Sequence, residues 1–291
     1  MFPAEDPRFR VRKLRMKSGI SVRVLECGSE SAPPVLLYPG WACSVYVFRF
    51  VLPALAEMGY RAISVDLKGH GLSDKPLGGR EYSREEMTSH VVEIYDALAL
   101  EKPVIGGHSL GAVYAMLVAA ERPGAIRGLL LYSPVGYRGV PGLLLYRLCS
   151  PGFLRWLLPY VAWRWIAAIT LRLAYGSIGK PASRDVDEYW APSQFPEFAL
   201  AIRDLLHQFD FGKAAPIRMD AVAQPSLVMF GTKDRLLNER VTARDAAMIP
   251  EAVIREIPGA GHVICEEAPD VVLSATGNFL ALLVQPDAAQ P

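Results

Sequence analysis

Short apolar runs alternate with longer amphipathic stretches along most of this chain. The apolar runs end at turn residues and cover residues 22–28, 34–40, 61–69, 103–109, 127–136, 225–234 and 252–261. Helix-like stretches lie between several of them, at residues 50–59, 83–100 and 111–123, and the second opens with the capping pattern Ser83 to Glu86. Near-continuous apolar strands that alternate with helices are typical of a mostly parallel sheet covered on both faces. The pattern therefore predicts an α/β protein.

The alternation stops after Gly136 and resumes near Gln224. The intervening sequence is rich in aromatic residues, contains several prolines and has the pattern of several helices without a strand. We therefore predict a core made of residues 1–135 and 216–291, with a helical cap inserted at residues 136–215.

Composition narrows the class of protein. The chain has 291 residues, of which 51% are apolar, and its net charge is +1. That is enough to bury one large core with a small appended lobe. A charge near zero offers no electrostatic reason to expect nucleic acid as a partner.

The cysteines and the apolar stretches indicate in which cellular compartment we expect the protein. Cys27, Cys43, Cys149 and Cys265 lie far apart and form no CxxC pair, so we expect them to be reduced and expect a cytoplasmic protein. The N-terminal segment has scattered charges and no apolar stretch of the kind that a secretory signal needs. Residues 142–173 are apolar but are interrupted by arginines and prolines, so we expect no transmembrane segment.

The stretch GHSLG, residues 107–111, fits the pattern GxSxG between a strand and a helix. In that context the motif makes a tight turn that exposes the serine at the end of the strand. The flanking glycines tolerate an unusual φ and leave room for a close approach of backbone. Ser109 is therefore a candidate nucleophile, with the N-terminus of the following helix beneath it.

A serine hydroxyl needs a base to take its proton, and the base needs an acid to orient it. Asp234 follows the apolar run at residues 225–234, and His262 follows the next run. All three residues then lie at the carboxyl ends of strands, which is the edge where open parallel sheets place their sites. The chain order of Ser109, Asp234 and His262 is the order that α/β hydrolases use.

Five motifs in this order resemble the α/β-hydrolase fold superfamily, in its cap-bearing branch of serine esterases and C–C hydrolases. They are YPGW (38–41), DLKGHGLSDKP (66–76), GGHSLG (106–111), FGTKDRL (230–236) and GAGH (259–262). The resemblance covers about residues 11–283. It implies that Ser109 is the nucleophile, that His262 is the general base and acid, and that Asp234 orients His262.

The resemblance also implies an oxyanion hole made of two backbone N–H groups. These would be the N–H groups of Leu110, which follows the nucleophile, and of Trp41, which follows Gly40. Many relatives have His-Gly where this chain has Pro39-Gly40, but a backbone donor needs no histidine side chain. We expect Gly40, Trp41, Val135 and Val263 to contact substrate. We expect the side chain of His108 to point away from the nucleophile and to pack under the sheet.

These residues favour acyl transfer to water through an acyl-enzyme. A serine nucleophile excludes the haloalkane dehalogenases and epoxide hydrolases of this fold, which attack with aspartate. We predict a carboxylesterase that cleaves a hydrophobic ester, or a related thioester or lactone. Two alternatives stay open: a C–C bond hydrolase of a ring-cleavage dienoate, and a ligand-binding receptor-like protein that retains the triad.

The cap holds many large apolar residues, which we expect either to line the pocket or to pack against the sheet. They are Leu143, Leu144, Leu145, Tyr146, Phe153, Trp156, Leu157, Leu158, Tyr160, Trp163 and Trp165. The interspersed arginines allow a second interpretation, in which the cap makes peripheral contact with a lipid surface. HExxH and CxxC metal motifs are missing, as is GxGxxG in a dinucleotide-binding context. We expect no metal or cofactor, a small-molecule substrate, and a monomer or a dimer.

Overall fold

A computed structural model describes residues 1–135, 143–211 and 218–284. In these residues eight strands form one sheet in the order β1-β2-β4-β3-β5-β6-β7-β8. The strands are β1 (Phe9–Arg15), β2 (Ser21–Cys27), β3 (Pro34–Tyr38), β4 (Arg61–Asp66), β5 (Val104–His108), β6 (Gly128–Tyr132), β7 (Ser226–Gly231) and β8 (Val253–Ile257). From β4 to β8 all neighbours are parallel, which confirms the predicted mostly parallel sheet.

Two strands at one edge differ from the sequence prediction. The strand β1 is one that the apolar pattern does not mark, because five of its seven residues are exposed. It is an edge strand that pairs through its backbone with β2 and needs no apolar face. The strand β2 is almost wholly buried and has the same continuous apolar pattern as the parallel strands, yet it is antiparallel to both neighbours.

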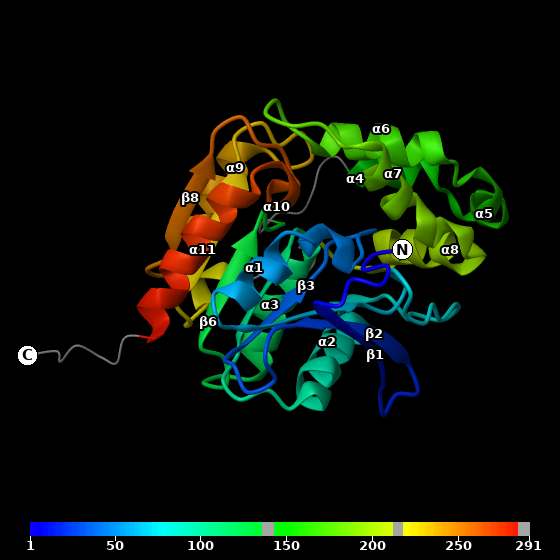
Figure 1. Ribbon diagram of the computed structural model, residues 1–291. Coiled ribbons are helices and arrows are strands. Elements are labelled where there is room, and N and C mark those ends of the chain that lie inside the picture. Colours follow the sequence, from blue (N-terminus) through cyan, green and yellow to red (C-terminus); the bar gives the residue numbers. More distant parts are fainter. Residues whose placement is uncertain (136–142, 212–217, 285–291) are drawn as a thin grey trace, which may run out of the picture.

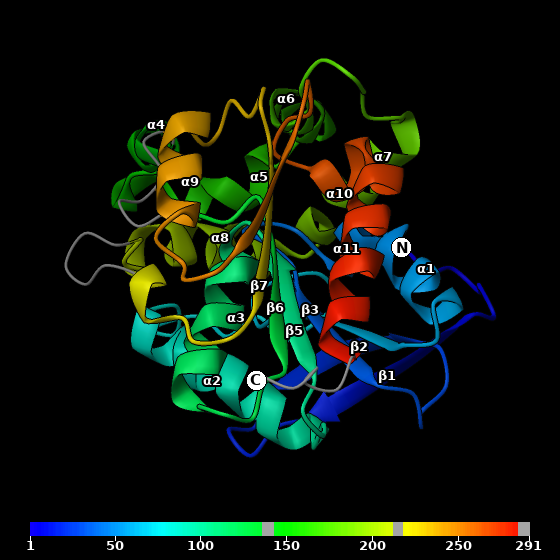
Figure 2. The ribbon, with the colours of Figure 1, turned by 90° about the vertical axis from the view of Figure 1, so that its left-hand side faces the viewer.

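Helices cover both faces of the sheet, as Figure 2 shows. The helices α1 (Val51–Glu57) and α11 (Pro269–Val284) pack on one face, and α2 (Arg84–Leu98), α3 (Leu110–Glu121) and α9 (Glu239–Ala246) on the other. Each face has its own cluster of buried apolar side chains. Short elements complete this part of the chain: η1 (Val45–Phe48), η4 (Met219–Ala221) and α10 (Ile264–Glu267).

A group of helices follows β6 and precedes β7, and it lies to one side of the sheet in Figure 1. We call it the cap. It contains α4 (Leu143–Cys149), η2 (Gly152–Leu157), α5 (Leu158–Val161), α6 (Arg164–Ala174), α7 (Ser183–Trp190), η3 (Ala191–Gln194) and α8 (Pro196–Gln208). The predicted cap boundaries, residues 136 and 215, lie outside the described residues.

Candidate active site

A sharp bend joins β5 to α3 at Ser109. The backbone of Ser109 has a φ of 56° and a ψ of −118°, a conformation that residues with a Cβ rarely adopt. A Cβ on Gly107 would collide with the backbone of Gly111, and a Cβ on Gly111 would collide with the carbonyl oxygen of Tyr38. The N–H of Ser109 donates to the carbonyl oxygen of Tyr132 at 2.8 Å. Neighbouring strands therefore hold the serine in its strained conformation.

Asp234 and His262 meet beyond the ends of β7 and β8. The Nδ1 of His262 lies 2.7 Å from the Oδ2 of Asp234, and both side chains are buried. The other carboxylate oxygen, Oδ1, accepts hydrogen bonds from the N–H groups of Leu236 and Leu237 at 2.8 and 2.9 Å. The carboxylate is therefore fixed. Because it contacts Nδ1 of His262, the other ring nitrogen, Nε2, makes no contact with Asp234.

The charge state of Asp234 follows from these contacts. Burial by itself would raise the pKa of Asp234. The adjacent His262 and the hydrogen bonds from His262, Leu237 and Leu236 outweigh that effect and hold the pKa below its ordinary value. Asp234 is therefore ionised at neutral pH and stabilises a positive charge on His262.

Ser109 and His262 border the same cavity, which has a volume of about 300 Å³. Leu110, Trp41, Val135 and Val263 also line it. The structure therefore brings most of the predicted site residues together. Gly40 is not one of the residues that line the cavity. It lies behind Ser109, where an added Cβ would come within 3.0 Å of the Cβ of Ser109.

The two candidate oxyanion donors come from different elements. Leu110 is the first residue of α3, so its N–H has no partner within the helix. Trp41 lies in the turn after β3, and its indole Nε1 donates to the carbonyl oxygen of Ile202 in α8 at 3.0 Å. The indole thereby joins the core side of the cavity to the cap.

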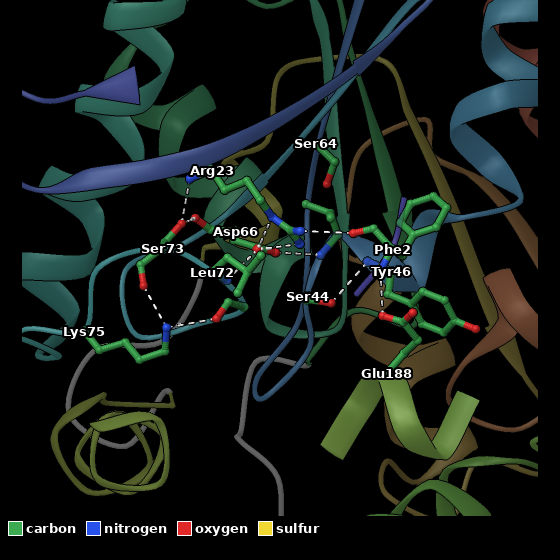
Figure 3. A network of polar contacts seen from close by, with 12 residues as sticks. Phe2, Arg23, Ser44, Tyr46, Ser64, Asp66, Leu72, Ser73, Lys75 and Glu188 are labelled. Atoms are coloured by element: carbon green, nitrogen blue, oxygen red, sulfur yellow. Dashed lines mark hydrogen bonds and ion pairs between the residues drawn. The ribbon is translucent and has the colours of Figure 1, made fainter. Parts of the chain in front are cut away.

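The turn after β3 is anchored from below by Asp66, which Figure 3 shows at the centre of a polar network. Its Oδ1 accepts from the N–H of Val45 at 2.8 Å. Its Oδ2 accepts from the Nε of Arg23 at 2.8 Å and from the N–H of Leu72 at 2.9 Å. A Cβ on Gly71 would collide with this carboxylate. Asp66 therefore joins β2, the start of η1 and the loop after β4, and it is not one of the residues that line the cavity.

His108 does not lie where the sequence prediction placed it. Its ring packs against the ring of His262, with 4.8 Å between centroids, and its Nε2 lies 2.9 Å from the carbonyl oxygen of His262. We expected the side chain to point away from the nucleophile and to pack under the sheet, but it borders the same cavity as Ser109. Burial, with the neighbouring His262, lowers the pKa of His108 to about 3. His108 is therefore neutral and supports the His262 loop.

A second reactive side chain also borders the cavity. Cys43 is buried, and this burial, reinforced by Glu266, raises the pKa of its thiol to about 12. Only a thiolate is a good nucleophile. Cys43 therefore does not compete with Ser109 as a nucleophile.

Comparison with known proteins decides the family. Residues 35–275 match the Alpha/beta hydrolase family over most of the chain. The chain belongs to this family. The resemblance and the fold class that the motifs predicted are thereby confirmed.

Similar proteins support hydrolysis and differ in the bond that is cleaved. A 2-(acetamidomethylene)succinate hydrolase of Mesorhizobium japonicum is 26% identical, over 90% of this chain and 92% of the relative. Epoxide hydrolase A of Mycobacterium tuberculosis is 28% identical, over 90% of this chain and 95% of the relative. A solved haloalkane dehalogenase of Bradyrhizobium elkani has a TM-score of 0.81 at 19% identity and covers 94% of this chain and 98% of its own.

The cap supplies most of the cavity wall of this hydrolase. The lining residues of the cap include Tyr146, Trp163, Ile166, Ala167, Thr170, Leu171, Ala174, Tyr189, Trp190, Phe198 and Phe211. No aspartate, glutamate, lysine or arginine lines the cavity among residues 1–135, 143–211 and 218–284. In the same ranges, no group of three or more metal-binding side chains is close enough together to hold a metal ion. The cavity is therefore suited to an apolar, uncharged group.

The sequence prediction for the cap is only partly correct. Tyr146 and Trp163 line the cavity. Phe153, Trp156 and Tyr160 do not line it and are exposed. The side chains of residues 143–145 lie outside the described part. The prediction missed the lining residues of α6, which share one face of that helix.

The segment after α6 is hydrogen-bonded to the loop that carries His262. The N–H of His262 donates to the carbonyl oxygen of Ala174 at 2.6 Å, and the N–H of Ser177 donates to that of Gly259 at 2.8 Å. Glu267 joins both segments. Its carboxylate accepts from the N–H of Gly176 and the N–H of Gly261, at 2.9 and 2.7 Å. The cap and the His262 loop therefore form one hydrogen-bonded unit.

The described residues contain no helix long and apolar enough to cross a membrane. This finding concerns spanning segments alone.

Proposed function

We propose that this protein is a carboxylesterase-like serine hydrolase that cleaves an uncharged, hydrophobic carboxylic ester. The observation that carries the proposal is a single cavity. It is bordered by Ser109 on its strained bend and by His262 paired with Asp234, and its described lining has no charged carboxylate, lysine or arginine. Thioesters and lactones would use the same residues.

The first half of the reaction forms an acyl-enzyme. The Oγ of Ser109 attacks the ester carbonyl carbon while the Nε2 of His262 takes the hydroxyl proton. Asp234 stabilises the imidazolium that results, because it is already ionised and fixed by the N–H groups of Leu236 and Leu237. The leaving alkoxide takes the proton from His262 and departs as the alcohol.

The second half uses water. His262 takes a proton from a water molecule, whose oxygen attacks the acyl carbon. The bond to Ser109 breaks and the proton returns to the Oγ. In both halves the carbonyl oxygen becomes negative, and we assign its stabilisation to the backbone N–H groups of Leu110 and Trp41. One such donor is typically worth about 3 kcal/mol of transition-state stabilisation.

The cap, residues 136–215 in our proposal, selects the substrate. Its contribution to the wall is apolar, and Trp41, Val135 and Val263 remain our candidates for substrate contact on the core side. Gly40 is no longer a candidate, because it packs behind Ser109 and does not line the cavity. The four cysteines are free in the structure, which supports the cytoplasm as the compartment.

Covalent labelling tests the proposal directly. A fluorophosphonate probe should label Ser109, and peptide mass mapping should locate it there. The purified protein should hydrolyse nitrophenyl esters, and Ser109→Ala should abolish both labelling and turnover while the unfolding midpoint stays unchanged. Labelling at another residue, or a folded protein inactive on every chain length, would reject the assignment.

The C–C hydrolase alternative makes a different demand on the cavity, because its substrate is charged. A dienoate carries a carboxylate, and no arginine lines the described part of the cavity to meet it. We therefore expect no turnover of a dienoate chromophore, and turnover faster than that of any ester would reverse the proposal. The receptor-like alternative predicts a ligand-dependent rise in thermal stability with a single slow turnover.

A further inference from the structure

The large apolar side chains that are most exposed concentrate in the cap. Phe153, Tyr160 and Trp156 are 76%, 72% and 69% exposed, and Trp165, Ile169 and Leu173 of α6 are exposed as well. We call these six residues the outer apolar surface of the cap. Single exposed apolar residues are ordinary, but such a concentration on a soluble domain marks an interaction site.

The helix α6 carries three of these six residues on the side opposite the cavity. Ile166, Thr170 and Ala174 line the cavity, whereas Trp165, Ile169 and Leu173 repeat at a spacing of four residues on the other side. In both ribbon views α6 lies at the outer edge of the molecule (Figures 1 and 2). The outer side of a surface helix is normally polar, so the exposed Trp165, Ile169 and Leu173 indicate that a partner covers the outer side of α6.

The charge of the surrounding sequence identifies the partner. Residues 122–184 contain nine arginines and lysines and no aspartate or glutamate, although the whole chain is nearly neutral. Arg172 lies on the outer side of α6, and among the described residues Arg172, Lys180 and Arg184 are exposed and form no ion pair within 4 Å. Tryptophan and tyrosine beside arginine and lysine suit the interface of a bilayer that contains anionic lipids.

A second copy of this chain fits less well. A symmetric dimer places the same surface on both subunits, and it would bring the two basic segments together. Like charges facing each other across an interface are unfavourable.

We propose that the outer apolar surface of the cap docks this protein on an anionic lipid bilayer. Trp163 and Ile166 border the cavity and are also exposed, so the docked surface continues into the cavity wall. If the proposed esterase function holds, the bilayer is then also the source of a lipophilic ester substrate. The docking itself does not depend on that function.

Vesicle flotation with the full chain tests the docking, and Ser109→Ala provides a protein in which binding is measured without turnover. Vesicles of phosphatidylcholine with about a third phosphatidylglycerol should carry the protein upward, and vesicles of phosphatidylcholine alone should carry at least about fivefold less. Binding to the anionic vesicles should weaken as salt is raised.

Two variants and a matched control locate the surface. Ile169→Glu should reduce binding to both kinds of vesicle, and Arg172→Glu should reduce binding to anionic vesicles by at least about fivefold. Leu282→Glu changes an equally exposed apolar residue on α11 and should leave binding unchanged. Equal loss in Leu282→Glu and Ile169→Glu, or no flotation of the unmodified protein, would overturn the proposal.

Sedimentation velocity tests whether a second copy of this chain, and not lipid, covers the outer apolar surface of the cap. A dimer in the absence of lipid that Ile169→Glu converts to monomer would assign the surface to a second copy and overturn lipid docking. Esterase activity without vesicle binding would reject the docking proposal and leave the esterase proposal standing. Vesicle binding by an unmodified protein that hydrolyses no ester would reject the esterase proposal and leave the docking proposal standing.

Discussion

The helices α3 and α6 are both apolar, yet they have opposite environments. In α3 nine residues are buried, from Leu110 to Ala119, because the helix lies between the sheet and α2. In α6 only Leu171 and Ala174 are buried, because one side faces the cavity and the other faces solvent. In these two helices, apolar side chains are buried in the core in one place and exposed on the cap in the other.

The contrast extends to the two sides of the cavity. The core side holds the proposed reacting groups on strand ends, where hydrogen bonds fix Ser109 and Asp234. The cap side provides an apolar wall and is joined to the core through Glu267, Glu188 and Trp41. We therefore expect changes on the core side to affect chemistry or stability, and changes on the outer side of the cap to affect neither.

The largest effect should come from the core side. Asp234→Asn should lower kcat by about 10⁴, because the amide favours the wrong tautomer of His262. The measurement is steady-state hydrolysis of a nitrophenyl ester. Asp245→Asn is the control, since Asp245 is a buried aspartate outside the cavity lining, and it should leave kcat nearly unchanged. Equal losses in both variants would show that Asp234 acts only through stability.

Stability should separate α3 from α6. Met116→Ala in α3 removes a buried side chain and should lower the free energy of unfolding by about 2–5 kcal/mol. Leu173→Ala on the outer side of α6 should change it by less than about 0.5 kcal/mol. Urea unfolding measures both. A large loss of unfolding free energy in Leu173→Ala would mean that the outer side of α6 is packed in solution. The two helices would then not differ in environment as we describe.

The hydrogen bonds between the cap and the His262 loop should matter for turnover. Glu267→Gln replaces a carboxylate that accepts from Gly176 and Gly261. It should lower kcat by roughly tenfold, since hydrogen bonds to a charged group contribute about 1.5–3 kcal/mol.

Glu188→Gln is the matched control for this prediction. Glu188 also joins the cap to the core, through the N–H of Phe2 at 2.8 Å, and Figure 3 places this contact in the network around Asp66. It should lower the unfolding midpoint and leave kcat unchanged. If both variants changed kcat equally, the link to the His262 loop would have no special role.

The last prediction concerns pH. Burial, with Lys68 nearby, lowers the pKa of His90 to about 3, whereas the unfolded value is about 6.5. Between these values the unfolded chain binds more protons, so stability falls as pH falls. This group contributes about 1.4 kcal/mol per pH unit. His90→Gln should remove that contribution between about pH 6 and pH 4. His207→Gln, at an exposed histidine of the cap, should change the slope much less.

Much of the core could be predicted because its signals are local. Each buried parallel strand is a short apolar run, and Ser109, Asp234 and His262 each follow such a run. The edge strand β1 could not be recognised, because its pairing with β2 uses backbone groups that leave no apolar pattern. The place of His108 could not be predicted either, because its partner His262 is 154 residues away along the chain.

The sequence by itself determined the order of the buried strands and of the helices that cover them, the bend at Ser109 and the three polar residues at one edge of the sheet. Regular spacing of apolar residues and the common edge of parallel strands are sufficient for these. Only the tertiary structure decided which side of α6 meets the cavity and that Glu267 joins Gly176 to the His262 loop. Glu267 and Gly176 are 91 residues apart, and contacts at such separations depend on how the elements pack, which no local pattern encodes.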